Sequence, residues 1–337
     1  LIPHSNILKN LPEIPMMDYN SKVIKKIPAI LNEEKPTFVY HFHAFFNYSL
    51  VELKKKYKRP FFLQAEGVLQ WVKKNWGKTY FPELLAKMEK SVWNHADGIF
   101  CVSETVRRQL IDYGAQEDKI HILTCKADTD FFTPNIDDKV FKKQIKPNDE
   151  IIIGFLGTFG KWHGIEFLAE NVKAITERIP NSKFLFIGDG ELRGKVENIL
   201  ENHGIRDKVF ITGLVNYYEV PKYLSTCDIL VSPCIPNEKG EFINSPVKLF
   251  EYMSMGKPLV ASDIGQQSEI VKDGVNGIIC KTSDSRDFVN KVVDLFENKE
   301  LQIRISKQAR QDAINHYDWI NNSKIVLSVF EDIKNNY

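Results

Sequence analysis

Residues 244–262, N-S-P-V-K-L-F-E-Y-M-S-M-G-K-P-L-V-A-S, combine a cation, a carboxylate and both end signals of a short helix. Ser245 is a favourable N-cap, and Pro246 suits the first helical position, where its missing N–H costs nothing. Gly256 suits the left-handed residue just past the helix end. The N-terminus of such a helix offers unpaired N–H groups and the positive end of the helix dipole, so phosphate is its natural ligand.

Lys248 and Glu251 lie three residues apart in this helix and therefore share one face. Lys248 is expected either to add positive charge at the phosphate or to be a solvated surface residue. Glu251, one turn inside the helix, is placed to hold sugar hydroxyls of the same ligand. The pattern indicates a site for a nucleoside diphosphate sugar.

The elements around this helix alternate between strand and helix, as in a parallel sheet with helices on both faces. The predicted strands of the second half cover residues 151–157, 183–188, 208–213, 228–233, 258–262 and 277–280. The predicted helices there cover 163–178, 190–203, 217–226, 246–255, 265–273 and 284–298. Six strand–helix repeats make a complete Rossmann-like domain, which binds ligands at the carboxyl ends of its strands.

The first half shows the same alternation but looks incomplete. Its predicted strands cover 37–43, 60–65, 97–103 and 119–124, and its predicted helices cover 44–58, 80–95 and 104–114. Residues 1–30 offer only a short helix where a full unit would begin with a strand and a Gly-rich turn. The first strands are therefore expected to be absent from this sequence or supplied elsewhere. The polar run 134–150 predicts a linker between the two halves.

Composition bounds the class of protein. A chain of 337 residues suits two domains, and its 43% apolar and 26% charged residues are typical of a soluble globular protein. The net charge of +1 argues against a nucleic-acid partner. Five well-separated cysteines without a C-x-x-C pair favour a reducing compartment over a disulfide framework or a zinc site. No run approaches the roughly 20 apolar residues of a membrane span, and no signal peptide is visible, so a cytoplasmic location is expected.

The second half resembles the donor-binding domain of GT-B glycosyltransferases, in particular the retaining family 4, the glycosyl transferases group 1. The resemblance rests on the order and spacing of G-T-F-G-K-W-H-G (157–164), F-I-G-D-G-E-L (186–192), V-F-I-T-G-L-V (209–215), the helix segment 245–262 and E-I-V-K-D-G-V-N-G-I-I-C (269–280). Residues 119–134 resemble the end of the family's first domain. Residues 317–333 resemble the family's final helix, which crosses back to that domain.

This resemblance implies an α/β protein of the GT-B fold, with two Rossmann-like domains facing a cleft. The acceptor domain would cover residues 1–137, completed by a final helix at 318–337, and the nucleotide-sugar donor domain would cover 148–317. The implied activity is retaining, metal-independent and cofactor-free transfer of a sugar from UDP or GDP to a glycan, lipid-linked or other hydroxyl acceptor, in polysaccharide or glycoconjugate synthesis. A catalytically weak GT-B subunit that binds or scaffolds, or a sugar-nucleotide epimerase of the same fold, is the alternative.

The resemblance also assigns donor-binding residues: Gly157, Thr158, Gly160, Asp189, Gly190, Gly213, Leu214, Val215, Ser245, Pro246, Val247, Lys248 and Glu251. The backbone around residues 245–247 would face the diphosphate, and Glu251 would hold the ribose. The backbone at 213–215 would read the base edge, which leaves UDP and GDP unseparated. The turn at Asp189 has a purely structural interpretation as its alternative.

The candidates for stabilising the leaving group are Lys161 and His163. Family members usually carry an Arg where this chain has Thr158 and a Lys where it has His163. The family's second glutamate corresponds to Ile243, and the nearest carboxylate is Glu241, a substitute or a loop residue.

In the first half, His43 and Glu66 are further catalytic candidates, because each lies at the end of a predicted strand. His41 shares a strand face with His43, and buried structural histidines are the alternative. Glu66 either contacts the transferred sugar or the acceptor hydroxyl, or caps the next helix. A metal-binding interpretation of the D-x-D at 128–130 is rejected, since that segment matches the family's end-of-domain pattern.

Two runs, 52–62 and 71–78, interleave lysines with aromatic residues. They predict either contact with an anionic membrane surface or a lipid-diphosphate acceptor, or else a solvated helix face.

Overall fold

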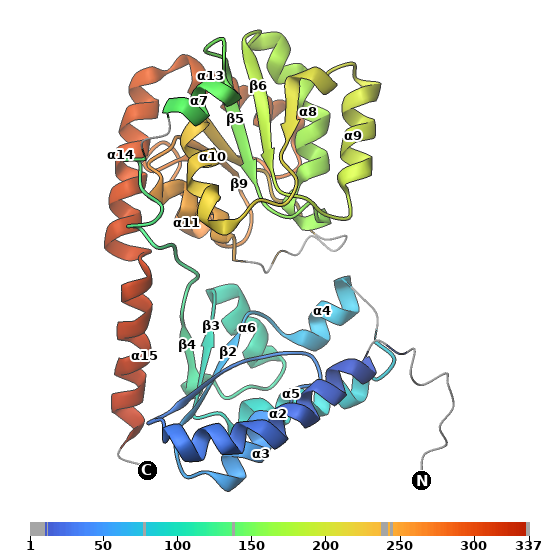
Figure 1. Cartoon of the computed structure of the whole chain (residues 1–337), viewed down its shortest axis with the longest axis vertical. Coiled ribbons are helices and arrows are strands. Elements are labelled where there is room, and N and C mark those ends of the chain that lie inside the picture. The colour runs from blue at the N-terminus through green and yellow to red at the C-terminus, as the bar shows by residue number, and fades with distance from the viewer. Residues whose placement is uncertain are drawn as a thin grey trace. The chain divides into compact units, whose positions relative to one another are not determined.

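The computed structural model describes residue 11 and residues 13–76, 79–136, 139–236, 242 and 245–334. The chain divides into two compact units. Unit 1 comprises Leu1–Thr124 and Asn322–Tyr337, and unit 2 comprises Cys125–Asn321. Each unit holds a parallel sheet covered by helices (Figure 1).

The sheet of unit 2 has six strands in the order β10-β9-β8-β5-β6-β7. The strands are β5 (Ile151–Leu156), β6 (Ser182–Ile187), β7 (Val209–Ile211), β8 (Ile229–Ser232), β9 (Leu259–Ser262) and β10 (Ile278–Cys280). All neighbouring pairs are parallel. The chain winds outward from β5 in one direction and then from β8 in the other. In doubly wound sheets such a switch point opens a crevice at the carboxyl ends of the two strands.

Helices cover both faces of this sheet: α7 (Lys139–Ile145), α8 (Ile165–Arg178), α9 (Arg193–Asn202), α10 (Val220–Thr226), α11 (Val247–Ser254), α12 (Gln266–Ile270), α13 (Ser285–Glu297) and α14 (Lys299–His316). Alternation along β5 divides the core into two clusters. Ile153 and Phe155 pack in one cluster with residues of α8, α9 and α13. Ile152 packs in the other with residues of α10, α11 and α14. The sheet is therefore buried on both sides, which explains the unbroken apolar runs of its strands.

Unit 1 contains a four-stranded parallel sheet, in the order β1-β2-β3-β4, among its described residues. Its strands are β1 (Val39–Phe42), β2 (Phe61–Ala65), β3 (Gly98–Cys101) and β4 (Ile120–Ile122), and its helices are α2 (Glu13–Glu34), α3 (Ser49–Lys56), α4 (Leu69–Trp76), α5 (Pro82–His95) and α6 (Glu104–Asp112). Helix α15 (Trp319–Ile333) places Val329 against Phe62 and Phe100 of this sheet. No helix in the described part of the chain combines the length and apolarity needed to cross a membrane.

The ten predicted strands and the α/β class are confirmed. The prediction of a linker at 134–150 is wrong in part, because that segment contains helix α7. The predicted short N-terminal helix is α2, which has 22 residues and contains Pro28. Helix α14 was not predicted, since its sequence is mostly polar; Asn298 caps it by accepting a hydrogen bond from the Leu301 N–H.

Candidate functional site

Glycine-rich turns follow β5 and β6 of unit 2, and their backbones touch. A Cβ atom on Gly188 would lie 2.1 Å from the carbonyl oxygen of Gly157, and one on Gly190 would lie 2.8 Å from the nitrogen of Phe159. Gly157 and Gly188 have φ values of +148° and +138°, which L side chains rarely adopt. Gly188 also bridges to Gly213, after β7. Glycine at these positions lets the backbones of the turns after β5, β6 and β7 lie in direct contact, and we call these three turns the glycine layer.

A further glycine joins this layer to the end of β8. The turn after β5 runs through a short 3-10 helix at Lys161–His163 and ends at Gly164, with φ +71°. A Cβ atom on Gly164 would lie 1.8 Å from the carbonyl oxygen of Pro233, just past β8. The carboxyl ends of β5 and β8 are therefore in direct contact at the switch point of the sheet.

The side chain of Lys248 reaches this layer from helix α11. Its residue is only 5% exposed, and its Nζ has no hydrogen-bond partner among the residues that the structure describes. The Nζ lies 4.1 Å from the ring centroid of Phe155 and 2.9 Å from where a Cβ of Gly157 would stand. Burial lowers the pKa of Lys248 to about 8, against the opposing influence of Cys234 and Glu251. The amine is thus largely charged at neutral pH, and an anion would supply the missing partner.

Glu251 accompanies Lys248 on the same face of α11 and is 8% exposed. Burial raises the pKa of Glu251 to about 7, while the charge of Lys248 pulls it down. Burial and then the Glu251 charge raise the pKa of Tyr217, so this tyrosine lies within electrostatic range. Both ionisable groups of the helix are therefore buried; the solvated alternative for Lys248 is wrong.

His163 differs from its predicted role as a positive group. Burial, followed by the nearby Lys248 charge, lowers the pKa of His163 to about 3. The imidazole is neutral at physiological pH, so His163 is able to donate a hydrogen bond but carries no charge. Lys161 and Thr158 are exposed beside it.

The start of α11 also differs from expectation. The helix begins at Val247 rather than Pro246, and Ser245 makes no capping bond. The Ser245 hydroxyl donates instead to Oε1 of Gln266, a residue that sequence reasoning missed. The Val247 N–H donates to the Ser245 carbonyl at 3.1 Å and the Leu249 N–H to the Pro246 carbonyl at 2.9 Å. Two of the N–H groups at this end are therefore engaged, and the positive charge available here comes mainly from Lys248.

Asp189 is held in the turn after β6 by two partners. Its Oδ1 accepts from the Gly190 N–H at 2.8 Å, and its Oδ2 accepts from Arg193 at 2.7 Å. These bonds favour the structural interpretation of Asp189, and Arg193, four residues later on α9, was not singled out from the sequence. After β7, Leu214 is 84% exposed, whereas Val215 is half-buried. Ile243 and Glu241 lie outside the described residues.

In unit 1, His43 is buried and Glu66 is exposed. Within the described ranges, the Nδ1 of His43 has no hydrogen-bond partner; it lies 3.9 Å from Oε1 of Glu89. Burial, with a contribution from His41, lowers the pKa of His43 to about 3, and burial raises that of Glu89 to about 7. Glu89 accepts hydrogen bonds from the N–H groups of Leu69 and the residue after it, so it caps α4.

The D-x-D segment makes a local turn. Oδ1 of Asp128 accepts from the N–H groups of Asp130 and Phe131, and the Thr129 hydroxyl donates to Asp318 at 2.6 Å. Within the part of the chain that the structure describes, no group of three or more His, Cys, Asp or Glu side chains is placed to hold a metal ion.

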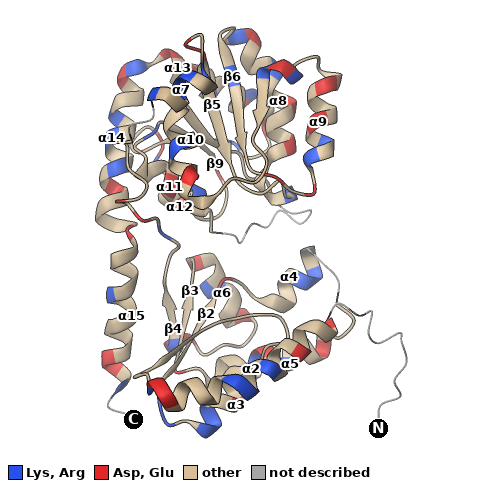
Figure 2. Ribbon diagram, viewed as in Figure 1, with Lys and Arg blue, Asp and Glu red and all other residues tan. Residues whose placement is uncertain are grey.

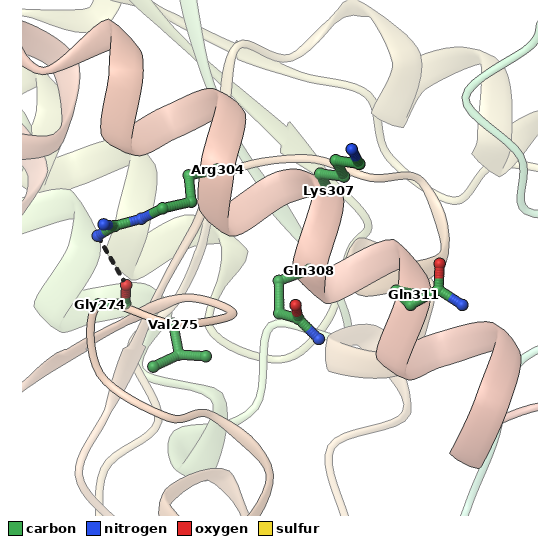
Figure 3. A pocket seen from close by; sticks show the side chains of 6 residues that line it. All are labelled: Gly274, Val275, Arg304, Lys307, Gln308 and Gln311. Atoms are coloured by element: carbon green, nitrogen blue, oxygen red, sulfur yellow. Dashed lines mark hydrogen bonds between the residues drawn. The ribbon is translucent and has the colours of Figure 1, made fainter.

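A pocket of about 710 Å³ shares no residue with this site. It is a surface pocket beside α14, lined by Gly274, Val275, Arg304, Lys307, Gln308 and Gln311 (Figure 3). Arg304 donates to the Gly274 carbonyl at 3.1 Å, and the lining cations are exposed. Nothing there resembles the buried, unpartnered amine of Lys248.

The pKa of Glu251 predicts a pH-dependent stability. Because its folded pKa lies near 7, above the unfolded value near 4.5, the folded state binds this proton more tightly. Glu251 alone should therefore lower the free energy of unfolding by up to about 3 kcal/mol as the pH rises from 4.5 to 7, in addition to the effects of Glu89, His43 and His163, whose pKa values are also shifted by burial. Glu251→Gln should remove this contribution, measured as the difference in slope from the wild type by urea unfolding across the range. Glu150, whose pKa of about 2 reflects its hydrogen bond from Lys183, is the control: Glu150→Gln should leave the slope between pH 4.5 and 7 intact. An unchanged slope in Glu251→Gln would contradict the burial of its charge.

Comparison with protein families finds two matches that together cover most of the chain. Residues 136–312 match the model described as glycosyl transferases group 1, and residues 4–131 match the model described as glycosyltransferase family 4.

Among similar sequences, an α-D-kanosaminyltransferase of Streptomyces kanamyceticus is 28% identical over 48% of this chain and 40% of its own length. A UDP-Gal:α-D-GlcNAc-diphosphoundecaprenol α-1,3-galactosyltransferase of Escherichia coli is 24% identical over 64% of this chain and 54% of its own length. The chain thus spans only 40% and 54% of the length of these two enzymes, respectively. An uncharacterized glycosyltransferase of Methanocaldococcus jannaschii is 25% identical over 97% of this chain and 85% of its own length.

Two solved structures have the same fold. HepE of Anabaena, in complex with UDP, superposes with a TM-score of 0.76 at 16% identity over 92% of this chain and 82% of its own. Sucrose-phosphate synthase of Thermosynechococcus elongatus superposes with a TM-score of 0.77 at 15% identity over 97% of this chain and 81% of its own. At this identity the likeness supports the GT-B fold.

Proposed function

Since the chain belongs to the glycosyl transferases group 1 family, we propose that it transfers a sugar from a nucleoside diphosphate sugar to a hydroxyl acceptor with retention of configuration. The resemblance noted from the sequence, and with it the GT-B fold, is confirmed. We further propose that the nucleotide of the donor is UDP or GDP and that the reaction does not require a metal ion.

The observation that carries this proposal is the unpartnered amine of Lys248. A buried cation that lacks a hydrogen-bond partner is costly, and a group with such a shifted pKa in a crevice is a candidate for ligand binding. Lys248 lies beside the glycine layer at the switch point of the sheet, where this class of fold binds nucleotides. A diphosphate carries the negative charge that suits this position. HepE, which shares the fold, was solved with UDP.

The reaction would break the bond between the anomeric carbon and the diphosphate oxygen. Negative charge then develops on the departing phosphate, where Lys248 would stabilise it, with Lys161 as a second cation. His163, being neutral, would donate a hydrogen bond. The acceptor oxygen attacks the same face of the sugar, and its proton passes to the departing phosphate, so charge and atoms balance without a protein nucleophile.

The remaining assignments concern the nucleoside and the acceptor. Glu251 would accept hydrogen bonds from the ribose hydroxyls. His43 and Glu66 are proposed acceptor-side residues of unit 1. The Escherichia coli relative acts on a lipid-linked diphosphate sugar, according to its name. We propose that this chain likewise uses a glycan or a lipid-linked acceptor. Its proposed location is the cytoplasm or the inner face of the membrane.

Nucleotide binding tests the proposal directly. UDP or GDP at 100 times its dissociation constant should stabilise the protein by about 2.7 kcal/mol, visible as a rise in melting temperature. Glu251→Gln should weaken binding about tenfold, since a charge-assisted hydrogen bond becomes a neutral one. The exposed Glu201 on α9 provides the control, because Glu201→Gln should bind as the wild type does.

Donor turnover separates the enzyme from a scaffolding subunit. Even without an acceptor, the enzyme is expected to hydrolyse UDP-glucose, UDP-galactose or GDP-mannose. The reaction is monitored by measuring the nucleoside diphosphate that it releases. Nucleotide binding with no turnover of any donor, under any acceptor tried, would favour the catalytically weak subunit. Absence of nucleotide binding would refute both.

A further inference from the structure

Unit 1 contains an apolar pocket that the proposed donor chemistry does not use. It has a volume of about 320 Å³ and is lined by Pro15, Met16 and Tyr19 of α2 and by Ala44, Phe45 and Asn47 after β1. Its volume lies at the lower end of the ~300–1,000 Å³ range of small-ligand sites. The pocket begins one residue after His43, the buried histidine with an unpaired nitrogen.

The lining of this pocket suits an apolar ligand better than a sugar. Pro15, Met16, Ala44 and Phe45 offer no hydrogen-bonding side-chain groups to hydroxyls. The Oδ1 atom of Asn47 already accepts from both the N–H and the hydroxyl of Ser49, at 3.0 and 2.7 Å. A buried hydroxyl without a partner costs a few kcal/mol, whereas each buried CH₂ gains about 0.8 kcal/mol.

The two walls of the pocket are fixed to each other. The Oδ1 of Asn20, a fully buried residue of α2, accepts from the N–H of Tyr48 at 3.2 Å. Between the walls, Phe46 adopts φ +55° and buries its ring, so the neighbouring Phe45 is left at the pocket. A pocket formed in this way is preorganised and does not have to be opened by its ligand.

One cation, Lys73, lies against the aromatic wall of the pocket. The Nζ of Lys73 lies 4.7 Å from the ring centroid of Phe45, and no carboxylate of the described residues is within 4.0 Å of it. Lys74 follows it and is exposed; the blue segment of α4 in Figure 2 marks the basic residues in the last turn of this helix. Glu13 is the nearby carboxylate: burial raises its pKa, but the hydrogen bond from the Tyr80 N–H and other interactions, the charge of Lys73 among them, hold the value below normal. Because Oε1 of Glu13 is engaged by the Tyr80 N–H at 2.8 Å and no described carboxylate forms an ion pair with Lys73, the Lys73 amine is available to an anion at the rim.

We propose that this pocket binds the isoprenoid end of a lipid-diphosphate acceptor. The first apolar units of the chain lie between α2 and Phe45, and the diphosphate meets Lys73. This assignment rests on the proposed sugar transfer and names the class of its acceptor. An apolar pocket with a cationic rim matches a ligand that is apolar at one end and anionic at the other.

Calorimetric titration with geranyl diphosphate tests this inference. The full chain is first saturated with whichever of UDP or GDP it binds, so that the Lys248 site is filled and does not capture the probe. Geranyl diphosphate should then bind at least tenfold more tightly than inorganic pyrophosphate and than geraniol, because each of those carries only one of the two features.

Three variants locate the binding. Met16→Asp should weaken geranyl diphosphate at least tenfold by placing a charge in the pocket, and Lys73→Gln should weaken it about fivefold. Ile30→Asp is the matched control, since Ile30 is 51% exposed at the other end of α2; it should bind as the wild type does. Donor hydrolysis should be unchanged in all three.

Geranyl diphosphate that binds no better than pyrophosphate, or equally well in Met16→Asp and Ile30→Asp, would overturn the inference. So would binding seen only with vesicles of anionic phospholipid, which would indicate a membrane surface contact. Because UDP or GDP binding is measured first in the same sample, failure of the nucleotide step would count against the proposed function. Failure of the second step alone would count against the pocket.

Discussion

Lys248→Met is expected to stabilise the protein while it lowers sugar transfer about 10²–10³-fold. The amine is buried and unpartnered, so its charge is a cost to the folded state that methionine of similar length removes. The depressed pKa of about 8 corresponds to a gain of about 1–3 kcal/mol, after allowance for the lost cation–π contact with Phe155. In a unit of this size that raises the melting temperature by about 3–8 °C. Thermal unfolding and donor turnover on the same preparation check both effects.

Lys257 provides the matched control for this change. The pKa of Lys257 is also lowered by burial, but its Nζ donates to the carbonyls of Ser225 and Cys227, each at 2.7 Å. Lys257→Met should therefore destabilise the protein by about 1–3 kcal/mol, since two carbonyls lose their donor. If Lys248→Met also destabilises and leaves turnover intact, Lys248 is a structural residue and the proposed diphosphate site is wrong.

The strands were predicted well from the sequence, because a strand buried on both faces consists mostly of consecutive apolar residues. β5 is apolar throughout apart from Gly154, and the last four residues of β6 (184–187) are apolar, as expected for strands covered on both faces. The turns that follow them were equally visible, since G-T-F-G and G-D-G place glycine where side chains have no room. The length of helix α2 was underestimated because its sequence contains prolines. Helix α14 was missed because its sequence is largely polar. Such helices are held by tertiary packing rather than by a local pattern.

The chemistry of the candidate site was less predictable. Lys248 and Glu251 share one helix face by their spacing, but their burial comes from tertiary packing, in which Lys248 lies against Phe155 and beside Gly157. The neutral state of His163 follows from the same burial, together with the charge of Lys248. Neither effect appears in residue types or spacing, because both depend on strands far apart in the chain. The hydroxyl of Ser245, a favourable N-cap by sequence, bonds Gln266 for a similar tertiary reason.

If the contact between glycine turns holds this site together, Gly188→Ala should be among the most damaging single changes in the chain. The added Cβ would lie 2.1 Å from the Gly157 carbonyl oxygen, at a φ of +138°, so one turn must move away from the other. We expect a loss of about 3–5 kcal/mol of folding stability and a loss of nucleotide binding, measured by urea unfolding and by the thermal shift with UDP or GDP.

Gly204 separates backbone strain from this collision, because it has φ +66° but no atom within 4 Å of an added Cβ. Gly204→Ala should cost only about 1–2 kcal/mol. Gly194 in α9 has neither constraint, and Gly194→Ala should stabilise by about 0.5–1 kcal/mol. Equal losses in Gly188→Ala and Gly204→Ala would mean that the turns after β5 and β6 do not support each other, and that Lys248 is positioned by α11 alone.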